Sequence, residues 1–286
     1  MPELPEVETI RRDLTKHVVG KLVQRVEVRK AKLIQGSRAV FRRALIGARI
    51  TRVSRRAKQL ILELSSGYVA LVHLKMTGQL VWRSRGGMLT VGGHPIISVN
   101  TVPNKFTYVT LRFSDGSALF FNDVRQFGYW RAVPLAELAV VHAHLGPEPL
   151  SSAFTPQVFW AALQRRGRTT IKAALLDQSV VAGIGNIYAD ESLYVARLRP
   201  SRRVASLRTV ETAALFRAIC SVLRKAVAAR GTSFNSYVDG LGRQGTYWER
   251  RLVYGRTGEA CRRCGTLFKR TVVAGRGSHW CAHCQH

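Results

Sequence analysis

Four cysteines near the end of the chain restrict its fold more than any other feature. Cys261 and Cys264 form one Cys-x-x-Cys pair, and Cys281 and Cys284 form a second pair after 16 intervening residues. Two such pairs can place four thiolates tetrahedrally around Zn²⁺ and close a ribbon too small to bury a core of its own. Because these cysteines fill all four positions, we predict one structural zinc ion. Two disulfides are the alternative, which a reducing interior of a cell disfavours.

The charge of the chain indicates a polyanionic partner. Lys and Arg number 45 against 17 Asp and Glu, which gives a net charge of +28 and a pI near 11.2. Solubility alone needs only a fraction of this charge. The basic residues occur in clusters along the whole chain, such as Arg52–Lys58 and Arg165–Arg168. This distribution favours a folded, positively charged channel over a disordered basic arm.

The length and hydropathy of the chain predict two domains with a small appendage. A chain of 286 residues exceeds the size at which single cores usually stop growing. No apolar stretch approaches the ~20 residues of a membrane span, and the acidic start Met1–Glu6 is not a secretory signal. We therefore expect a protein inside the cell. The fifth cysteine, Cys220, lies in a helical pattern and is interpreted as a core residue.

The N-terminal half is predicted to begin with a helix and to continue as an antiparallel β-sandwich. Residues 5–14 place Val7, Ile10 and Leu14 on one helical face, with Pro5 in the first turn. Apolar and polar residues then alternate, and turn signals such as Ser66-Gly67 separate the alternating stretches, which indicates strands. The clearest strands are Leu22–Val28, Gln59–Leu64, Tyr68–His73 and Tyr108–Phe113. The glycine-rich residues 85–103 are interpreted as a surface insertion.

The second half is predicted to be helical, which makes the whole chain an α+β protein. Helical patterns cover Pro156–Arg165, Ile171–Asp177, Asn186–Ala196 and Leu207–Ala229. Residues 231–245 contain four glycines and no periodicity, which indicates a loop. We expect a helix and β-sandwich in residues 1–134, a linker in 135–155, a helical domain in 156–250 and a zinc ribbon in 251–286.

The extreme N-terminus could supply a nucleophile. Met before Pro is normally removed, which would expose the secondary amine of Pro2, with a reference pKa of about 8 against about 10.4 for lysine. Such an amine can attack an electrophilic sugar carbon and form a cationic iminium. Glu3 and Glu6 follow at a helix start, where carboxylates can act as acids or electrostatic partners. Pro and Glu are also ordinary helix-start residues, so the pattern alone leaves a purely structural interpretation open.

A glycine-containing segment opens one of the predicted helices. Gly183-Ile184-Gly185 precedes Asn186, and backbone N–H groups at such a helix start can bind a phosphate. The segment lacks the preceding strand and third glycine of a dinucleotide site, so DNA backbone is the better candidate ligand.

Six segments together resemble the bacterial formamidopyrimidine-DNA glycosylase (Fpg, MutM) family. They occur in the family's order from one end of the chain to the other: Pro2–Glu8, Arg55–Lys58, His73–Gly78, Asn122–Gly128, Gly183–Glu191 and the four-cysteine ribbon. Each motif is modest alone, and their joint occurrence is specific. The resemblance implies that residues 156–250 form a helix-two-turn-helix DNA-binding domain whose loop 231–245 closes over an extruded base.

The resemblance implies catalytic roles for five residues. Pro2 would attack C1′ of the damaged nucleotide, displace the base and hold the sugar as a Schiff base. Glu3 would transfer protons on the opening sugar, and Glu6 would position water or the amine. Lys58 would assist β-elimination and contact phosphate, and Arg276 on the ribbon would promote δ-elimination. The product would be a one-nucleotide gap that bears phosphates.

The resemblance also implies residues that bind DNA. Met76, Arg125 and Phe127 match the residues that fill the hole left by an extruded base, a hole that costs a few kcal/mol if left empty. Arg125 would bond to the orphaned cytosine, and Phe127 would wedge beside it. The remaining DNA-binding positions are His73, Arg168, Lys172 and Asn186.

The activity implied is that of a glycosylase and abasic-site lyase that excises oxidised purines, 8-oxoguanine and formamidopyrimidines, in base excision repair. Its partner would be double-stranded DNA that contains oxidised bases or abasic sites, with no membrane involved. We expect a monomer in the bacterial cytoplasm, associated with the nucleoid.

The chain departs from the family pattern in two places. Lys105-Phe106-Thr107-Tyr108 stands where the family usually carries Lys-His-Asp-His, so a histidine contact to DNA is missing or moved. His94, on the nearby insertion, is one candidate replacement. Asp123-Val124 replaces the usual Asp-Pro before Arg125, which changes a rigid turn.

Two other functions remain open at this point. The related endonuclease VIII-like enzymes prefer oxidised pyrimidines, but they commonly carry Gly where this chain has Leu4, and they take their void-filling residues from a different loop. A non-catalytic zinc-ribbon protein that binds damaged or bent DNA fits the charge and the ribbon equally well.

Overall fold

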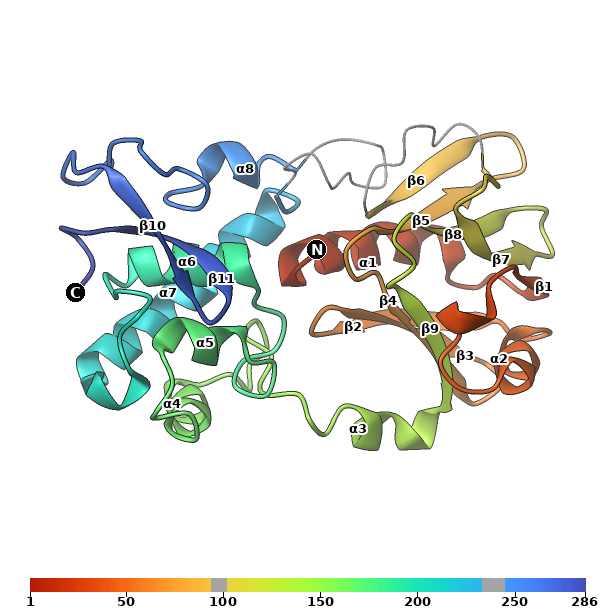
Figure 1. Ribbon diagram of the computed structural model, residues 1–286. Helices are drawn as coiled ribbons and strands as arrows, with labels where there is room; N and C mark the ends of the chain where they lie inside the picture. The colour runs from red at the N-terminus through yellow and green to blue at the C-terminus, as the bar shows by residue number, and fades with distance from the viewer. Residues whose placement is uncertain (94–101, 233–244) are drawn as a thin grey trace. The chain divides into compact units, whose positions relative to one another are not determined.

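The computed structural model describes residues 1–93, 102–232 and 245–286 (Figure 1). The described chain forms two compact units. Unit 1 comprises Met1–His142 and Ala229–Trp248, and unit 2 comprises Ala143–Ala228 and Glu249–His286. Of this segment the structure describes residues 229–232 and 245–248, which belong to unit 1, whereas the sequence places them within the helical domain.

Unit 1 is an antiparallel β-sandwich, which confirms the predicted fold. One sheet has the strand order β1 (Val23–Val28), β7 (Thr107–Phe113), β8 (Ala118–Asp123), β5 (Gly78–Arg83) and β6 (Met88–Gly93). The other has the order β2 (Ile50–Arg56), β3 (Gln59–Leu64), β4 (Tyr68–His73) and β9 (Tyr129–Pro134). The observed β3 and β4 coincide with two of the predicted strands.

Helix α1 (Leu4–Val18) is part of the sandwich core. Val7, Ile10 and Leu14 are buried in one cluster with apolar residues of both sheets, as their helical spacing predicts. This burial fixes the axis of α1 and thereby the place of its first turn, where the predicted nucleophile lies.

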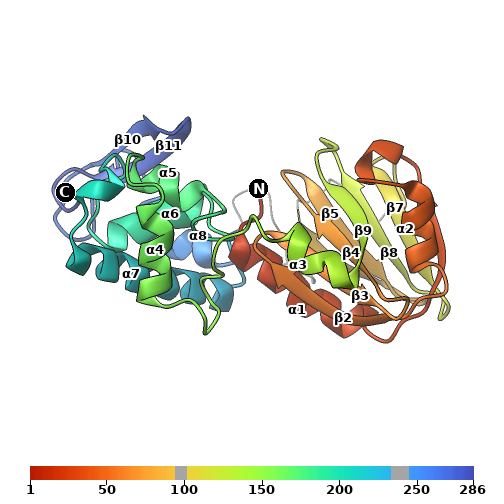
Figure 2. The ribbon, with the colours of Figure 1, turned by 90° about the horizontal axis from the view of Figure 1, so that it is seen from below.

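A second helix, α2 (Arg38–Leu45), closes the sandwich at the end opposite to the N-terminus of α1 (Figure 2). Its Phe41 packs edge-on against Trp130 of β9 at 6.0 Å between ring centroids, and Trp130 packs in the same way against Phe121 of β8. The remaining helical turns of this part of unit 1 are η1 (Ala31–Leu33), η2 (Leu135–Glu137) and α3 (Leu138–Val141), the last two within the predicted linker.

Unit 2 is helical and ends in a two-stranded ribbon, as predicted. Its helices are α4 (Pro156–Gln164), α5 (Ile171–Leu176), α6 (Asn186–Val195), η3 (Val204–Ser206) and α7 (Thr209–Ala228), and α8 (Tyr247–Arg250) crosses from unit 1 into unit 2. The ribbon pairs β10 (Phe268–Val273) with β11 (Arg276–Cys281). Thr155 and Thr170 cap α4 and α5 by accepting the N–H groups of Val158 and Ala173. Within the described ranges, no helix has the length and apolar character to cross a bilayer.

Candidate active site

The first turn of α1 is held by two buried carboxylates. Glu3 and Glu6 are each only 3% exposed, and the N–H of Glu3 donates to Glu6 Oε2 at 2.8 Å. Glu6 Oε1 also accepts the N–H of Thr232 at 2.7 Å. Gly231 has φ +82°, and a Cβ there would lie 2.7 Å from Glu6 Oε1, so this close approach requires glycine. Glu6 therefore joins the start of α1 to the residues just before segment 233–244, which lies outside the described residues.

The terminal amine lies among the predicted catalytic residues. Burial lowers the pKa of the Met1 amine below its ordinary value of 8.0. The charges of Glu3 and Glu6 oppose this decrease, and those of Lys58 and Arg125 add to it. Pro2 is buried directly behind Met1. Removal of Met1 would make the Pro2 nitrogen the terminal amine of the chain.

Lys58 is placed by an ion-pair network that reaches back to α1. It is 7% exposed and follows Ala57, whose φ of +52° marks the tight turn between β2 and β3. Arg55 donates from Nη1 to the Ala57 carbonyl at 2.7 Å and from Nε to Glu8 Oε2 at 3.3 Å. Burial alone would raise the pKa of Glu8, but hydrogen bonds from Arg11 and Arg12 lower it to about 2. Glu8 therefore stays ionised. Through Arg55 it connects α1, which begins just after Pro2, to the turn that precedes Lys58.

Met76, Arg125 and Phe127 project from two neighbouring loops of unit 1. Met76 is 39% exposed and Phe127 is 54% exposed, although both are large apolar side chains. The Arg125 guanidinium lies 4.8 Å from the centre of the Phe127 ring. Lys75 and Gln126, which adjoin these residues, have φ values of +51° and +57°. Positive φ at non-glycine residues is uncommon and typical of functional loops.

A buried carboxylate locks these two loops together. Asp123 is fully buried and accepts the Thr77 hydroxyl on one oxygen and the Gly128 N–H, at 2.6 Å, on the other. Thr77 Oγ1 in turn accepts the Arg125 N–H at 2.9 Å. These bonds fix both ends of the turn that carries Arg125 and Phe127, in which Val124 stands where the family has proline.

Removal of the Thr77 hydroxyl is expected to loosen this turn. In Thr77→Val, Asp123 loses a donor and Arg125 an acceptor, a change of about 1–3 kcal/mol. We expect the free energy of unfolding of unit 1 to fall by about this amount. Urea denaturation measures it. Thr77→Ser keeps the hydroxyl and serves as the control; equal stability of the two variants would exclude the role of this bond.

His73 is neutral and oriented as a donor. Burial lowers its pKa to about 3, and the charges of Lys75 and Lys58 contribute. His73 Nδ1 accepts the Lys75 N–H at 3.0 Å, so the proton of the neutral ring resides on Nε2. Because the ring stays neutral at physiological pH, its Nε2–H can donate to a phosphate oxygen.

In unit 2, the start of α6 is tied to the turn of the ribbon. Asn186 Nδ2 donates to the Gly277 carbonyl at 3.1 Å, and Lys172 Nζ donates to the same oxygen at 2.8 Å. Lys172 Nζ also lies 2.7 Å from Asp190 Oδ1, and both side chains are fully buried. Asp190 Oδ2 accepts the backbone N–H of His279 at 2.9 Å. A direct phosphate contact by Lys172, as the resemblance implies, does not fit this burial; the structure favours a positioning role.

Two exposed cations that the sequence assigns to DNA, Arg276 and Arg168, lie at or beside turns of unit 2. Arg276 is exposed beside the β10–β11 turn, where Ala274 and Gly275 have φ values of +51° and +70°. Arg168 is exposed between α4 and α5. Each can reach phosphate without first breaking a buried contact. Phe106, which stands where the family has a histidine, is among the described residues. His94, the candidate replacement for that histidine, lies outside them.

The four cysteines of the ribbon fit one zinc ion. Their sulfur atoms all lie within 4.8 Å of one another, with 3.5 Å between Cys264 Sγ and Cys281 Sγ and 4.0 Å between Cys261 Sγ and Cys284 Sγ. Tetrahedral Zn–S bonds of about 2.3 Å separate sulfurs by roughly 3.8 Å, far more than the ~2.05 Å of a disulfide. The cysteines complete the coordination, so the zinc is structural.

Several residues of the site were not identified from the sequence. Thr77, Asp123, Glu8, Arg55 and Asp190 act through contacts between distant segments. All five lie in motifs that carry the family resemblance, but the sequence assigns no role to any of them. A polar residue that adjoins an apolar run, such as Asp123 at the end of β8, is a signal that the sequence offers.

A β-sandwich that buries the start of its own chain, followed by a helical domain with a zinc ribbon, defines a class of DNA glycosylases. Family models match the chain in succession: the formamidopyrimidine-DNA glycosylase N-terminal domain at residues 1–130, its H2TH domain at 145–237, and the zinc finger found in FPG and IleRS at 258–286. The chain belongs to the formamidopyrimidine-DNA glycosylase family and is a DNA glycosylase of DNA repair.

Individual relatives match over nearly the whole chain. The formamidopyrimidine-DNA glycosylase of Moorella thermoacetica is 45% identical over 267 residues, which cover 92% of each protein. The structure of MutM in complex with DNA containing carbocyclic 8-oxo-G is 32% identical and covers 100% of each chain with a TM-score of 0.87. A complex of Lactococcus lactis Fpg with DNA containing an abasic site is 31% identical and covers 99% of each chain with a TM-score of 0.86.

Proposed function

We propose that this enzyme excises oxidised purines, including 8-oxoguanine and formamidopyrimidines, from double-stranded DNA and then cleaves the strand at the abasic site. The observation that carries the proposal is the desolvated terminal amine among Glu3, Glu6 and Lys58. The relatives bound to 8-oxo-G and abasic DNA support the choice of substrate.

The proposed reaction begins with the uncharged Pro2 amine. Its lone pair attacks C1′ of the damaged nucleotide, the bond from C1′ to the base breaks, and the base leaves with a proton. Glu3 donates a proton to the ring oxygen as the sugar opens, which yields an iminium between Pro2 and C1′. Glu6, bound to the Glu3 N–H, keeps the amine in place.

Strand cleavage follows from the same iminium. Because it is a permanent cation, it makes the C2′ proton acidic, and loss of that proton expels the 3′ phosphate in β-elimination. Lys58 stabilises the departing phosphate, and Arg276 assists δ-elimination of the 5′ phosphate. Hydrolysis of the iminium then frees Pro2, and the gap keeps a phosphate at each end.

DNA recognition is assigned to both units. Met76, Arg125 and Phe127 fill the space of the extruded nucleotide, with Arg125 facing the opposite cytosine. Backbone phosphates are bound by His73, Arg168 and Asn186, with Lys172 positioning the ribbon. We propose that the enzyme acts as a monomer on nucleoid DNA in the bacterial cytoplasm.

A trapping experiment with a panel of lesions tests the proposal. Borohydride reduction should link the enzyme to duplexes with 8-oxoguanine opposite cytosine or an abasic site, and much less to thymine glycol. A preference for thymine glycol would indicate an endonuclease VIII-like enzyme. Binding without any covalent product would indicate a non-catalytic DNA-binding protein.

Loss of zinc is expected to weaken DNA binding without unfolding unit 1. Chelation or Cys281→Ser removes the cross-link of the ribbon and releases its cations from fixed positions. We expect affinity for lesion DNA to fall at least about tenfold, since fewer phosphates are neutralised. Fluorescence anisotropy measures the affinity, and near-ultraviolet circular dichroism monitors the sandwich. Unchanged affinity after verified zinc loss would count against the ribbon as a DNA contact.

A further inference from the structure

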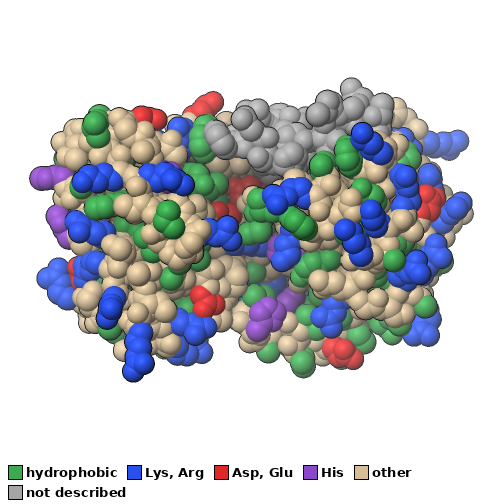
Figure 3. All heavy atoms as spheres, viewed as in Figure 1, with side chains coloured by type: hydrophobic (Ala, Val, Ile, Leu, Met, Phe, Trp, Pro, Cys, Tyr) green, Lys and Arg blue, Asp and Glu red, His purple; other side chains and the backbone are tan. Residues whose placement is uncertain are grey.

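A second concentration of positive charge lies on unit 1 around α2. It consists of six side chains, which we call the α2 face: Arg29, Lys30, Lys32, Arg38, Arg42 and Arg43. All six are exposed or half-buried, and the sequence has no Asp or Glu between Glu27 and Glu63. Figure 3 shows Lys and Arg side chains over the outer part of unit 1. None of these residues takes part in the proposed reaction.

The charges of the α2 face are not neutralised by carboxylates. Arg42 donates to the Val26 carbonyl at 3.2 Å, and Arg29 donates to the Asn104 carbonyl at 2.9 Å. The adjacent Glu27 is engaged by Arg112 at 2.7 Å. Throughout the described ranges, none of the six cations forms an ion pair. Backbone carbonyls orient two of the six side chains and do not neutralise their charge.

The centre of the α2 face is hollowed. A notch of about 320 Å³ is lined by Val28, Arg38, Ala39 and Arg42. The two arginines are one helical turn apart, so their guanidinium groups are neighbours on the same side of α2. Arginine forks match phosphate oxygens in paired hydrogen bonds. The notch is suited to a phosphate and its sugar, and the face has no exposed aromatic anchor of the kind that protein partners bury.

The α2 face is separate from the catalytic end of the sandwich. α2 precedes the start of β2, whereas Lys58 follows its end. The seven residues of β2 span about 20 Å, roughly 3.3 Å each. A duplex bound at Lys58 would therefore leave the α2 face open to a different segment of DNA.

We infer that the α2 face binds the backbone of a second, undamaged duplex while the active site holds the first, which allows direct transfer of the enzyme between DNA segments. This inference rests on the proposed function, because it takes the first duplex to be bound at the active site. DNA is favoured over an acidic protein because the face offers repeated cations and a notch bordered by two arginines, with no exposed aromatic side chain among its six members.

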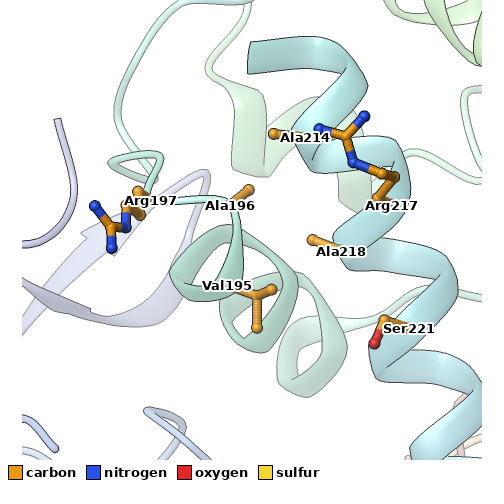
Figure 4. A pocket seen from close by; sticks show the side chains of 7 residues that line it. All are labelled: Val195, Ala196, Arg197, Ala214, Arg217, Ala218 and Ser221. Carbon is orange, nitrogen blue, oxygen red and sulfur yellow. The ribbon is translucent and has the colours of Figure 1, made fainter. Parts of the chain in front are cut away.

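Charge-reversed variants with a matched control test the inference. Arg38→Glu with Arg43→Glu alters the α2 face and leaves the Arg42 bond intact. Arg197→Glu with Arg217→Glu makes the same change in net charge on unit 2, where both arginines border a shallow hollow between the end of α6 and α7 (Figure 4). The measurement is the dissociation rate of each protein from a labelled 8-oxoguanine duplex against the concentration of unlabelled undamaged duplex.

We expect dissociation of wild type and of the control to accelerate with competitor. For the α2-face variant, competitor should accelerate dissociation at least about fivefold less, because loss of a few phosphate contacts weakens DNA binding by a factor of this size. Excision from a short isolated duplex should stay unchanged in both variants. The inference would be overturned if competitor duplex accelerated dissociation of both variants equally. It would also be overturned if polyglutamate accelerated dissociation of wild type as much as duplex DNA does. Absence of excision by wild type would instead refute the proposed function.

Discussion

Protein that retains Met1 is expected to excise 8-oxoguanine at least on the order of 1,000-fold more slowly than protein that begins at Pro2, since loss of a catalytic nucleophile can cost more than this. In the Met1–Pro2 peptide, the proline nitrogen shares its lone pair with a carbonyl and cannot form an iminium. The Met1 amine has similar surroundings, but it lies one residue, about 3.8 Å along the chain, from the Pro2 position. Misplacement of a reacting group by 1 Å can already cost about 100-fold.

The comparison uses one polypeptide in two forms. A removable N-terminal tag is cleaved either directly before Pro2 or so that Met1 remains, and mass spectrometry verifies each product. Single-turnover excision and borohydride trapping are then measured on the same duplex. Both forms should bind undamaged DNA equally, since no phosphate contact changes. Full-speed excision by the Met1 form would refute Pro2 as nucleophile.

The sequence predicted elements with regular patterns and missed those in which packing overrides the pattern. Strands Gln59–Leu64 and Tyr68–His73 coincide with the structure. Only the end of β2 was assigned to a strand, at Arg55–Lys58, because an irregularity between Ile50 and Arg52 breaks the alternation of its first residues. β8 was missed for the opposite reason: all its residues, including Asp123, are buried, so no alternation exists.

The sequence was most informative about reactive groups and least informative about what positions them. Residues such as Pro2 lie in short motifs with a chemical meaning. The Thr77–Asp123 bond joins residues 46 apart, and the Asp190–His279 contact joins residues 89 apart. A local pattern cannot show such pairs. Lys172 illustrates the point, since the resemblance implies a phosphate ligand there, whereas the structure buries its ammonium group against Asp190.

Asp190→Asn is expected to lower the free energy of unfolding of unit 2 by about 3–5 kcal/mol, because it leaves the Lys172 ammonium buried without its counter-charge. The asparagine can still offer its oxygen to the His279 N–H, but its NH2 group then faces Lys172, which loses both the counter-charge and the acceptor. Asp177→Asn is the matched control. Asp177 pairs with Arg166 at the surface, 2.8 Å apart, and its loss should cost no more than about 1 kcal/mol.

Urea denaturation of the zinc-loaded variants, followed by the helical circular dichroism of unit 2, measures both effects. Since Lys172 and Asn186 hold the Gly277 carbonyl next to Arg276, the Asp190 variant should also release less δ-elimination product for each β-elimination product. A merely destabilised protein would lose both products in proportion when assayed well below its unfolding transition. An unchanged product ratio, together with equal stability of the two asparagine variants, would show that the buried pair neither stabilises unit 2 nor positions the ribbon.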